Sequence, residues 1–148
     1  MSVIALAERN VPRYTSYPTA PHFTADVGPS VYAAWLAAVP ADAALSLYIH
    51  VPYCTEICRY CGCHTKATLR PEPLDAYVEA LIGEIGLVAA ATAARGVVHL
   101  HWGGGTPSIL GPERLARIVQ WIAQHFDLSH IAEHAIELDP RQVTRPLA

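Results

Sequence analysis

The chain has 148 residues and a formal net charge of −3 at neutral pH. This is the size of one globular domain, and the mild charge without any basic block argues against nucleic acid as a partner. No apolar run is long enough to cross a membrane, and the first residues lack the basic start and the apolar stretch of a signal peptide. All four cysteines lie close together, which, without a secretion signal, predicts a reducing compartment, the cytoplasm.

The first 44 residues are predicted to form an N-terminal extension. Residues 13–23 mix aromatic side chains with prolines, which favours an extended or turning segment. A short helix is predicted next, with Ser30 as its cap and Pro40 as its end. We expect this helix to serve packing.

Strands and amphipathic helices are predicted to alternate from residue 45 onward. Apolar and polar residues alternate in the first strand, whereas apolar residues recur every three or four positions in the helices. The predicted order is a strand at 45–51, a helix at 74–88, a strand at 97–102, a helix that starts at 111–112 and runs to 126, and a strand at 134–139. Each connection is long enough for a right-handed crossover, so the prediction is an α/β fold with parallel strands.

Cysteines dominate the loop that follows the first predicted strand. Cys54, Cys58 and Cys61 form the spacing C-x3-C-x2-C, which offers three thiolates to a metal centre. Structural zinc requires four ligands in a closed tetrahedron, whereas a four-iron cluster on three cysteines keeps one iron open for an outside ligand. Because clusters usually have four cysteine ligands, Cys63 is weighed as the fourth, although its spacing points it away from a cluster bound to Cys61. A three-cysteine cluster is predicted, with zinc, disulfides or inert thiols as the alternatives.

Two further candidate sites follow the later strands. The segment Gly103-Gly-Gly-Thr-Pro107 has three consecutive residues without a Cβ, so a ligand can approach its backbone directly. A simple tight turn is the alternative. Glu137 lies inside the third predicted strand, where a buried carboxylate is costly unless it is paired. From the residues alone, it would pair with a neighbouring lysine or arginine or face water. All three candidate sites fall at the carboxyl ends of strands, where barrel-type active sites lie.

Four motifs together resemble one known family. C-x3-C-x2-C is the cluster motif of the radical S-adenosylmethionine (SAM) superfamily. In the same order along the chain, the motifs resemble those of the oxygen-independent coproporphyrinogen III oxidases at 13–19, 48–63, 101–107 and 136–141. The Cys61-Gly-Cys63 ending separates the chain from the related haem-chaperone branch, which usually lacks the last cysteine.

This resemblance implies a partial (β/α)6 barrel, of which the chain supplies about the first half. Residues 45–148 would be the N-terminal part of a radical SAM core, and 1–44 its N-terminal extension. Family members are much longer, so we expect this sequence to be a fragment that is unstable or aggregated and inactive by itself, because half a barrel leaves a sheet edge and apolar faces unprotected.

The resemblance also implies cofactors and site residues. A 4Fe-4S cluster would bind Cys54, Cys58 and Cys61, and two SAM molecules would share the site. The residues that match SAM contacts of the family are Tyr48, Tyr60, Gly104, Gly105, Thr106 and Glu137, of which Tyr60, Gly105 and Thr106 match contacts of the second SAM. Cys63 would lie beside that second SAM and matter for activity.

Other roles remain open for several of these residues. Tyr48 as a half-buried core tyrosine, Tyr60 in ordinary packing and Cys63 as a bystander thiol are the alternatives. The family usually has glutamate after Asp-Pro-Arg, and here the residue is Gln142, which puts the local pairing of Arg141 in doubt.

The implied activity is the oxidative decarboxylation of coproporphyrinogen III to protoporphyrinogen IX in haem biosynthesis. A 5′-deoxyadenosyl radical would take hydrogen from a propionate side chain, and loss of carbon dioxide and one electron would leave a vinyl group, in two rounds. We expect a monomeric enzyme served by an electron donor that the sequence does not identify. The alternative function is a haem-binding or iron–sulfur carrier protein of the haem-chaperone branch, since the eight histidines leave haem binding open.

Overall fold

The computed structural model describes residues 22–145, so the predicted N-terminal motif at 13–19 lies outside the described residues. The chain divides into two units, Met1–Tyr32 and Ala33–Ala148. Helix α2 (Pro29–Ala37) begins with proline, whose missing N–H costs nothing in the first turn of a helix. The prediction that Ser30 caps this helix was therefore wrong, because Ser30 lies inside its first turn.

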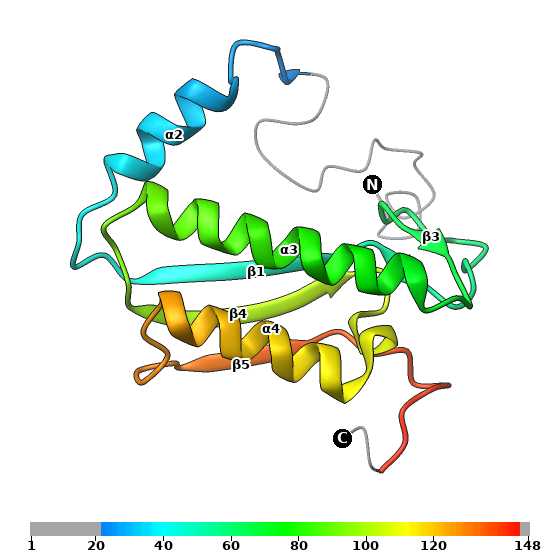
Figure 1. Ribbon diagram of the computed structural model, residues 1–148. Coiled ribbons are helices and arrows are strands. Elements are labelled where there is room, and N and C mark those ends of the chain that lie inside the picture. Colours follow the sequence, from blue (N-terminus) through cyan, green and yellow to red (C-terminus); the bar gives the residue numbers. More distant parts are fainter. Residues whose placement is uncertain (1–21, 146–148) are drawn as a thin grey trace, which may run out of the picture. The chain divides into compact units, whose positions relative to one another are not determined.

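The predicted alternation of strands and helices is confirmed (Figure 1). The elements are β1 (Leu45–Val51), α3 (Glu72–Ala91), β4 (Val97–Gly104), α4 (Gly111–His125) and β5 (Glu133–Ile136). The three strands form one parallel sheet in the order β1-β4-β5. Neighbouring parallel strands need long crossover connections, and α3 and α4 provide them.

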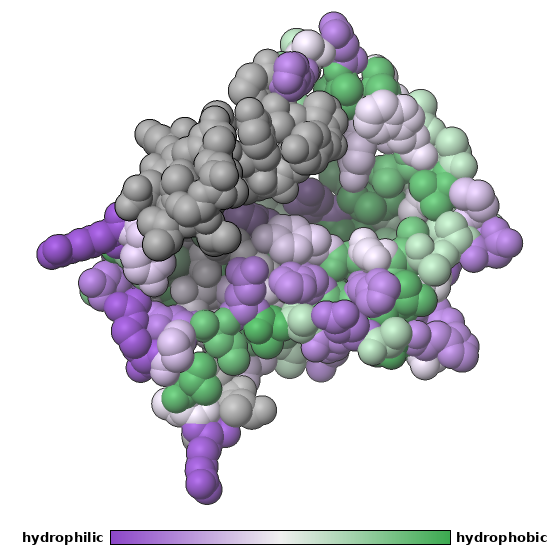
Figure 2. Space-filling view, turned by 180° about the vertical axis from the view of Figure 1, so that it is seen from behind, coloured by the Kyte–Doolittle hydropathy of each residue, from purple (hydrophilic) through white to green (hydrophobic). Residues whose placement is uncertain are grey.

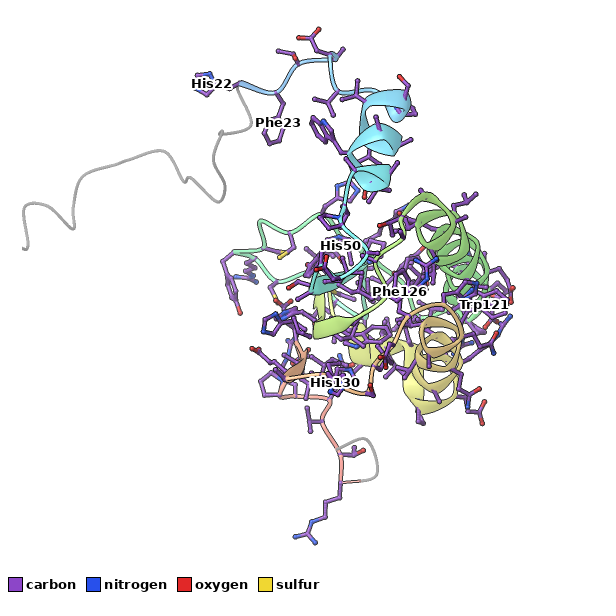
Figure 3. The ribbon with its side chains drawn as sticks, turned by 90° about the vertical axis from the view of Figure 1, so that its left-hand side faces the viewer. His22, Phe23, His50, Trp121, Phe126 and His130 are labelled. Atoms are coloured by element: carbon purple, nitrogen blue, oxygen red, sulfur yellow. The ribbon has the colours of Figure 1, made fainter. Side chains whose placement is uncertain are left out.

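Helices α3 and α4 cover the same face of the sheet, as Figure 3 shows in a view along the strands. Their apolar stripes meet the apolar side chains of β1 and β4. The fully buried members of this core include Val51, Val78, Val97, Leu100, Trp102, Ile118 and Ile122. Burial of each such side chain stabilises the fold by roughly 1.5–3 kcal/mol, so this layer holds the domain together.

Two ion pairs join the exposed sides of the same helices. The Arg114 guanidinium lies 2.6 Å from a carboxylate oxygen of Asp75, and that of Arg117 lies 2.5 Å from Glu79. Hydrogen bonds from the arginines lower the pKa of both carboxyl groups. Because these side chains are exposed, the pairs fix the helix register more than they add stability.

Several short elements were not predicted. Strands β2 (Tyr53–Cys54) and β3 (Lys66–Ala67) pair in parallel and form a second, two-stranded sheet. A 3₁₀ helix, η2 (Pro107–Leu110), follows the Gly-rich turn. Strand β5 ends at Ile136, so the predicted strand end at 139 was wrong. Among residues 22–145, no helix is both long and apolar enough to cross a membrane.

Candidate functional site

The loop that carries the cysteines is joined at its base by β2 and β3. Tyr53 pairs with Lys66 and Cys54 with Ala67, and the Thr68 N–H donates to the Cys54 carbonyl at 2.9 Å. All four cysteines have free thiols. The loop therefore presents its thiols from a fixed base at the carboxyl end of β1.

The Gly-rich turn after β4 contacts this base directly. The Thr106 N–H donates to the Tyr53 carbonyl at 2.8 Å, and the Thr106 hydroxyl donates to the Cys54 sulfur at 3.4 Å. A second hydroxyl, that of Thr65, also lies 3.4 Å from the same sulfur. The structure thus brings together the cysteine motif and the Gly-rich turn, as their positions after neighbouring strands predicted.

The glycines of the turn are required by the chain itself. A Cβ on Gly103 would lie 2.7 Å from the Tyr48 hydroxyl, and one on Gly105 would lie 2.5 Å from the Tyr53 carbonyl oxygen. Gly104 has a φ of +105°, which side chains rarely tolerate, and its Cβ would meet His50 at 2.7 Å. Open access for a ligand is therefore not needed to explain these glycines, because neighbouring protein atoms fill the space that a Cβ would take.

Glu137 lies just beyond the end of β5, and its side chain is 54% exposed. The prediction of a carboxylate inside an apolar strand was therefore wrong. One carboxylate oxygen accepts a hydrogen bond from the Gly104 N–H at 3.1 Å, and the other lies 3.7 Å from Nε2 of His101. Glu137 pairs with a backbone amide and a histidine, and its exposed oxygens retain room for further donors.

Tyr48 lies on the face of the sheet that the helices leave open, so it is not a core tyrosine. Its ring stacks on His101 at a centroid distance of 5.7 Å, and its hydroxyl lies 3.3 Å from Nδ1 of His50. Burial, followed by the nearby charges of Glu137 and Cys63, raises the pKa of Tyr48. Residues from β1, the cysteine loop and the end of β5 therefore meet at one place.

The remaining predicted residues lie further out on the loop. Cys63 is exposed, and its thiol lies near that of Cys61. Partial burial, the Cys61 thiol and then Glu137 raise the pKa of Cys63. Tyr60 is 88% exposed and has no polar or aromatic partner among the described residues. Its predicted role stays a prediction.

The sequence prediction missed an arginine contact to the cysteine loop. Arg141 forms a two-pronged ion pair with Asp139, with nitrogen–oxygen distances of 2.8–3.2 Å. From there its guanidinium reaches Glu56 at 3.6 Å and the Cys58 sulfur at 4.0 Å. Gln142 donates to the Thr55 hydroxyl, so both residues tie the segment after β5 to the loop. The Asp-Pro-Arg motif was visible in the sequence, but no local pattern indicated its partners.

The cysteine thiols can be tested for their fit to a cluster of several irons, in which each thiolate has its own metal atom. Among residues 22–145, no three Cys, His, Asp or Glu side chains converge on one metal position. A four-iron cluster does not require this convergence, because each thiolate binds a different iron. Three free thiols on one loop with a fixed base suit such a group.

A cavity of about 580 Å³ lies beside β2 and β3. Its lining residues are Tyr53, Thr55, Lys66, Ala67, Thr68, Leu69, Arg70 and Pro73. None of the predicted site residues lines it.

Comparison with solved structures defines the class first. Coproporphyrinogen III oxidase from Escherichia coli, described as a radical SAM enzyme, superimposes with a TM-score of 0.82 at 38% identity. The match covers 95% of this chain and 31% of that one. The predicted fold class, a parallel α/β part of a radical SAM core, is therefore confirmed.

Curated relatives make the similarity more specific. The oxygen-independent coproporphyrinogen III oxidase of Bradyrhizobium diazoefficiens is 47% identical over 95% of this chain and 32% of its own length. The enzymes of the same name from Paracoccus denitrificans and Escherichia coli are 45% and 41% identical. No protein-family model matches the chain. The resemblance predicted from the motifs is confirmed, and the chain spans about a third of the length of these relatives.

Proposed function

We propose that this chain is the cluster- and SAM-binding part of an oxygen-independent coproporphyrinogen III oxidase. The observation that carries the proposal is the meeting of three strand ends. Thr106 contacts Cys54, and Glu137 contacts the Gly104 backbone, so the cysteine loop, the Gly-rich turn and the acidic residue share one edge of the sheet. Carboxyl ends of parallel strands are where barrel enzymes place their chemistry.

Three residues would hold the 4Fe-4S cluster: Cys54, Cys58 and Cys61. The Thr106 and Thr65 hydroxyls beside Cys54 would orient its sulfur, as groups around metal ligands commonly do. When bound there, such a cluster would leave one iron open to SAM and would supply the electron for its reductive cleavage. The protein orients the reactants and excludes water and oxygen.

The other residues would bind SAM. Glu137 already accepts one hydrogen bond and is half exposed, so its carboxylate can accept more from ribose hydroxyls. Tyr48 lies beside it with its ring fixed on His101 and its hydroxyl near His50. Gly104, Gly105 and Thr106 would offer backbone groups to the methionine end. A second SAM would contact Tyr60, Gly105 and Thr106.

The substrate would be coproporphyrinogen III, converted by oxidative decarboxylation to protoporphyrinogen IX. Cys63 would be a catalytic residue beside the second SAM, consistent with its exposed position on the loop. We propose a monomeric cytoplasmic enzyme that receives electrons from a separate donor. The described residues leave β5 with an unpaired edge, which supports the proposal that this chain alone is unstable and inactive.

The test is anaerobic reconstitution of the complete gene product that carries this chain. We expect a reducible iron–sulfur cluster whose electron paramagnetic resonance (EPR) spectrum changes when SAM is added, with 5′-deoxyadenosine formed under dithionite. An unchanged spectrum with SAM would contradict the proposal. Zinc in place of iron, or stoichiometric haem binding without SAM cleavage, would indicate the alternative functions.

Two cysteine variants provide a matched pair. Cys58→Ser should lose the cluster and every response to SAM, because a hydroxyl does not replace an iron-bound thiolate. Cys63→Ser should retain iron content and the spectral response to SAM, yet lose turnover of coproporphyrinogen III. Loss of iron in both variants would show that Cys63 is a fourth ligand.

A further inference from the structure

Arg141 holds a position that the proposed SAM and substrate roles do not use. Arg141 follows β5, yet its guanidinium reaches the cysteine loop, which follows β1. Nη2 lies 4.0 Å from the Cys58 sulfur and 2.8 Å from an Asp139 oxygen, while Nη1 lies 3.6 Å from Glu56. One side chain therefore connects the end of β5 with a predicted cluster ligand.

The guanidinium is held in place from several directions. Asp139 accepts from Nε and Nη2 of Arg141 and also from its backbone N–H at 3.0 Å, and the Asp139 side chain is only 12% exposed. Planar two-pronged pairing of this kind fixes a guanidinium, which a lysine cannot reproduce. Gln142 adds a second link through the Thr55 hydroxyl. The N–H that points to Cys58 is thus positioned by the fold.

A positively charged N–H donor beside a cluster thiolate would raise the reduction potential of the cluster. Hydrogen bonds to cluster sulfurs and nearby charge both set the reduction potential of an iron–sulfur centre, since reduction adds negative charge to it. Arg141 also offsets the charge of two neighbouring carboxylates, Asp139 and Glu56. Without the arginine, both carboxylates would face the cluster uncompensated.

We propose that Arg141 is a positioning residue that acts through Cys58 and raises the reduction potential of the cluster. This inference rests on the proposed function, because it requires the cluster on Cys54, Cys58 and Cys61. The function of the segment after β5 would then be to hold the Arg141 guanidinium beside the cysteine loop. A higher potential would ease electron transfer from the separate donor to the cluster, the step that precedes SAM cleavage.

The experiment is a redox titration of the reconstituted complete gene product, followed by EPR. Arg141→Gln should lower the ratio of reduced to oxidised cluster about tenfold at a fixed applied potential, a shift of about 59 mV for a one-electron couple. The matched control is Arg117→Gln, which removes the same charge from the α3–α4 surface and should leave the ratio unchanged. A wild-type ratio in Arg141→Gln would overturn the inference.

Glu56→Gln gives a second test that does not depend on the first variant taking up a cluster. Glu56 is 74% exposed, so its replacement should not disturb folding, and removal of its charge should raise the reduced fraction several-fold. An unchanged ratio would contradict the electrostatic argument. The two proposals fail separately: a wild-type protein without a SAM-responsive cluster refutes the proposed function, whereas a responsive cluster insensitive to Arg141 refutes this inference alone.

Discussion

The two faces of the sheet differ in what their residues do. The face under α3 and α4 is dry, and Leu100 and Trp102 of β4 are almost fully buried there. On the opposite face of the same strand, His99 and His101 lie beside Ser46 and Tyr48 of β1. Figure 2 views the molecule from behind, where hydrophilic and hydrophobic side chains are interspersed. Neighbouring residues of one strand thus serve stability on one face and the site on the other.

This division has a physical reason. Apolar area removed from water stabilises the fold on the helix side, while the open side needs polar groups that still have hydrogen-bonding capacity. His101 stacks on Tyr48 and lies 3.7 Å from Glu137, and these side chains are only partly buried. Substitutions on the two faces should therefore separate stability from ligand binding.

The largest effect is expected from Trp102→Ala on the dry face. The loss of a buried ring and of its indole hydrogen bond to His134 should lower the free energy of unfolding by about 3–5 kcal/mol. His101→Ala, one position away on the open face, should cost less than about 1 kcal/mol. Urea denaturation of the complete gene product measures both. Equal losses would show that the two faces do not differ in this way.

Gly105→Ala tests the close contact between the Gly-rich turn and β2 at the base of the cysteine loop. Its new Cβ would lie 2.5 Å from the Tyr53 carbonyl oxygen, so β2 must shift, at a cost of about 1–3 kcal/mol. Iron content after reconstitution should fall as well, because Cys54 belongs to the displaced strand. Gly83→Ala in α3 is the control, since no atom lies near its Cβ and alanine favours helix; it should stabilise by up to about 1 kcal/mol. A fully stable Gly105→Ala would disprove the close contact.

Tyr77 links the layers, since its hydroxyl donates to the His50 carbonyl at 2.7 Å. Burial raises the pKa of Tyr77 to about 12 from 10.0, so the folded state keeps this proton while the unfolded chain loses it. Stability should be complete below pH 10 and fall by about 1–2 kcal/mol as the pH rises from 10 to 12, less than the full shift implies because the ring is partly exposed. Tyr77→Phe should be less stable by about 1 kcal/mol at pH 7 and should lack this part of the alkaline decline. Denaturant titrations at several pH values would measure the free energy of unfolding of both proteins. The same decline between pH 10 and 12 in the wild type and in Tyr77→Phe would contradict the prediction.

The smallest effect on stability is expected from Tyr48→Phe on the open face. Among residues 22–145 its hydroxyl has one hydrogen-bonding partner, His50 at 3.3 Å, so the free energy of unfolding should change by less than about 0.5 kcal/mol. SAM binding, measured by calorimetry on the reconstituted protein, should weaken about three- to tenfold, as loss of one hydrogen bond predicts. Unchanged affinity would remove Tyr48 from the proposed SAM site.

Most of the sheet and its helices could be predicted because their signals are long. The apolar periodicity of α3 and α4 and the alternation in β1 are properties of continuous segments. Strands β2 and β3 are too short to show a pattern, and each exists only because the other pairs with it. The end of β5 is likewise set by its register, in which Ile136 is the last residue to face β4.

The candidate site was predictable only as far as its motifs. The cysteines and the Gly-rich turn were identified by spacing and resemblance, and the fold brings them together at Cys54 and Thr106. The contacts of Arg141 join residues far apart in the sequence, so no local pattern contains them. The exposure of Glu137 was misjudged because the strand was expected to continue through it.

The pairing of β2 with β3 has a consequence for how the proposed cluster would assemble in the protein. A loop whose ends are already joined by strand pairing samples fewer conformations. The loop therefore loses less conformational entropy when its thiols bind a cluster. The proposed cluster would then assemble on an already folded apoprotein, unlike zinc fingers, in which the metal brings about folding. Chelation should accordingly strip the metal while the surrounding backbone keeps its shape, ready for reloading.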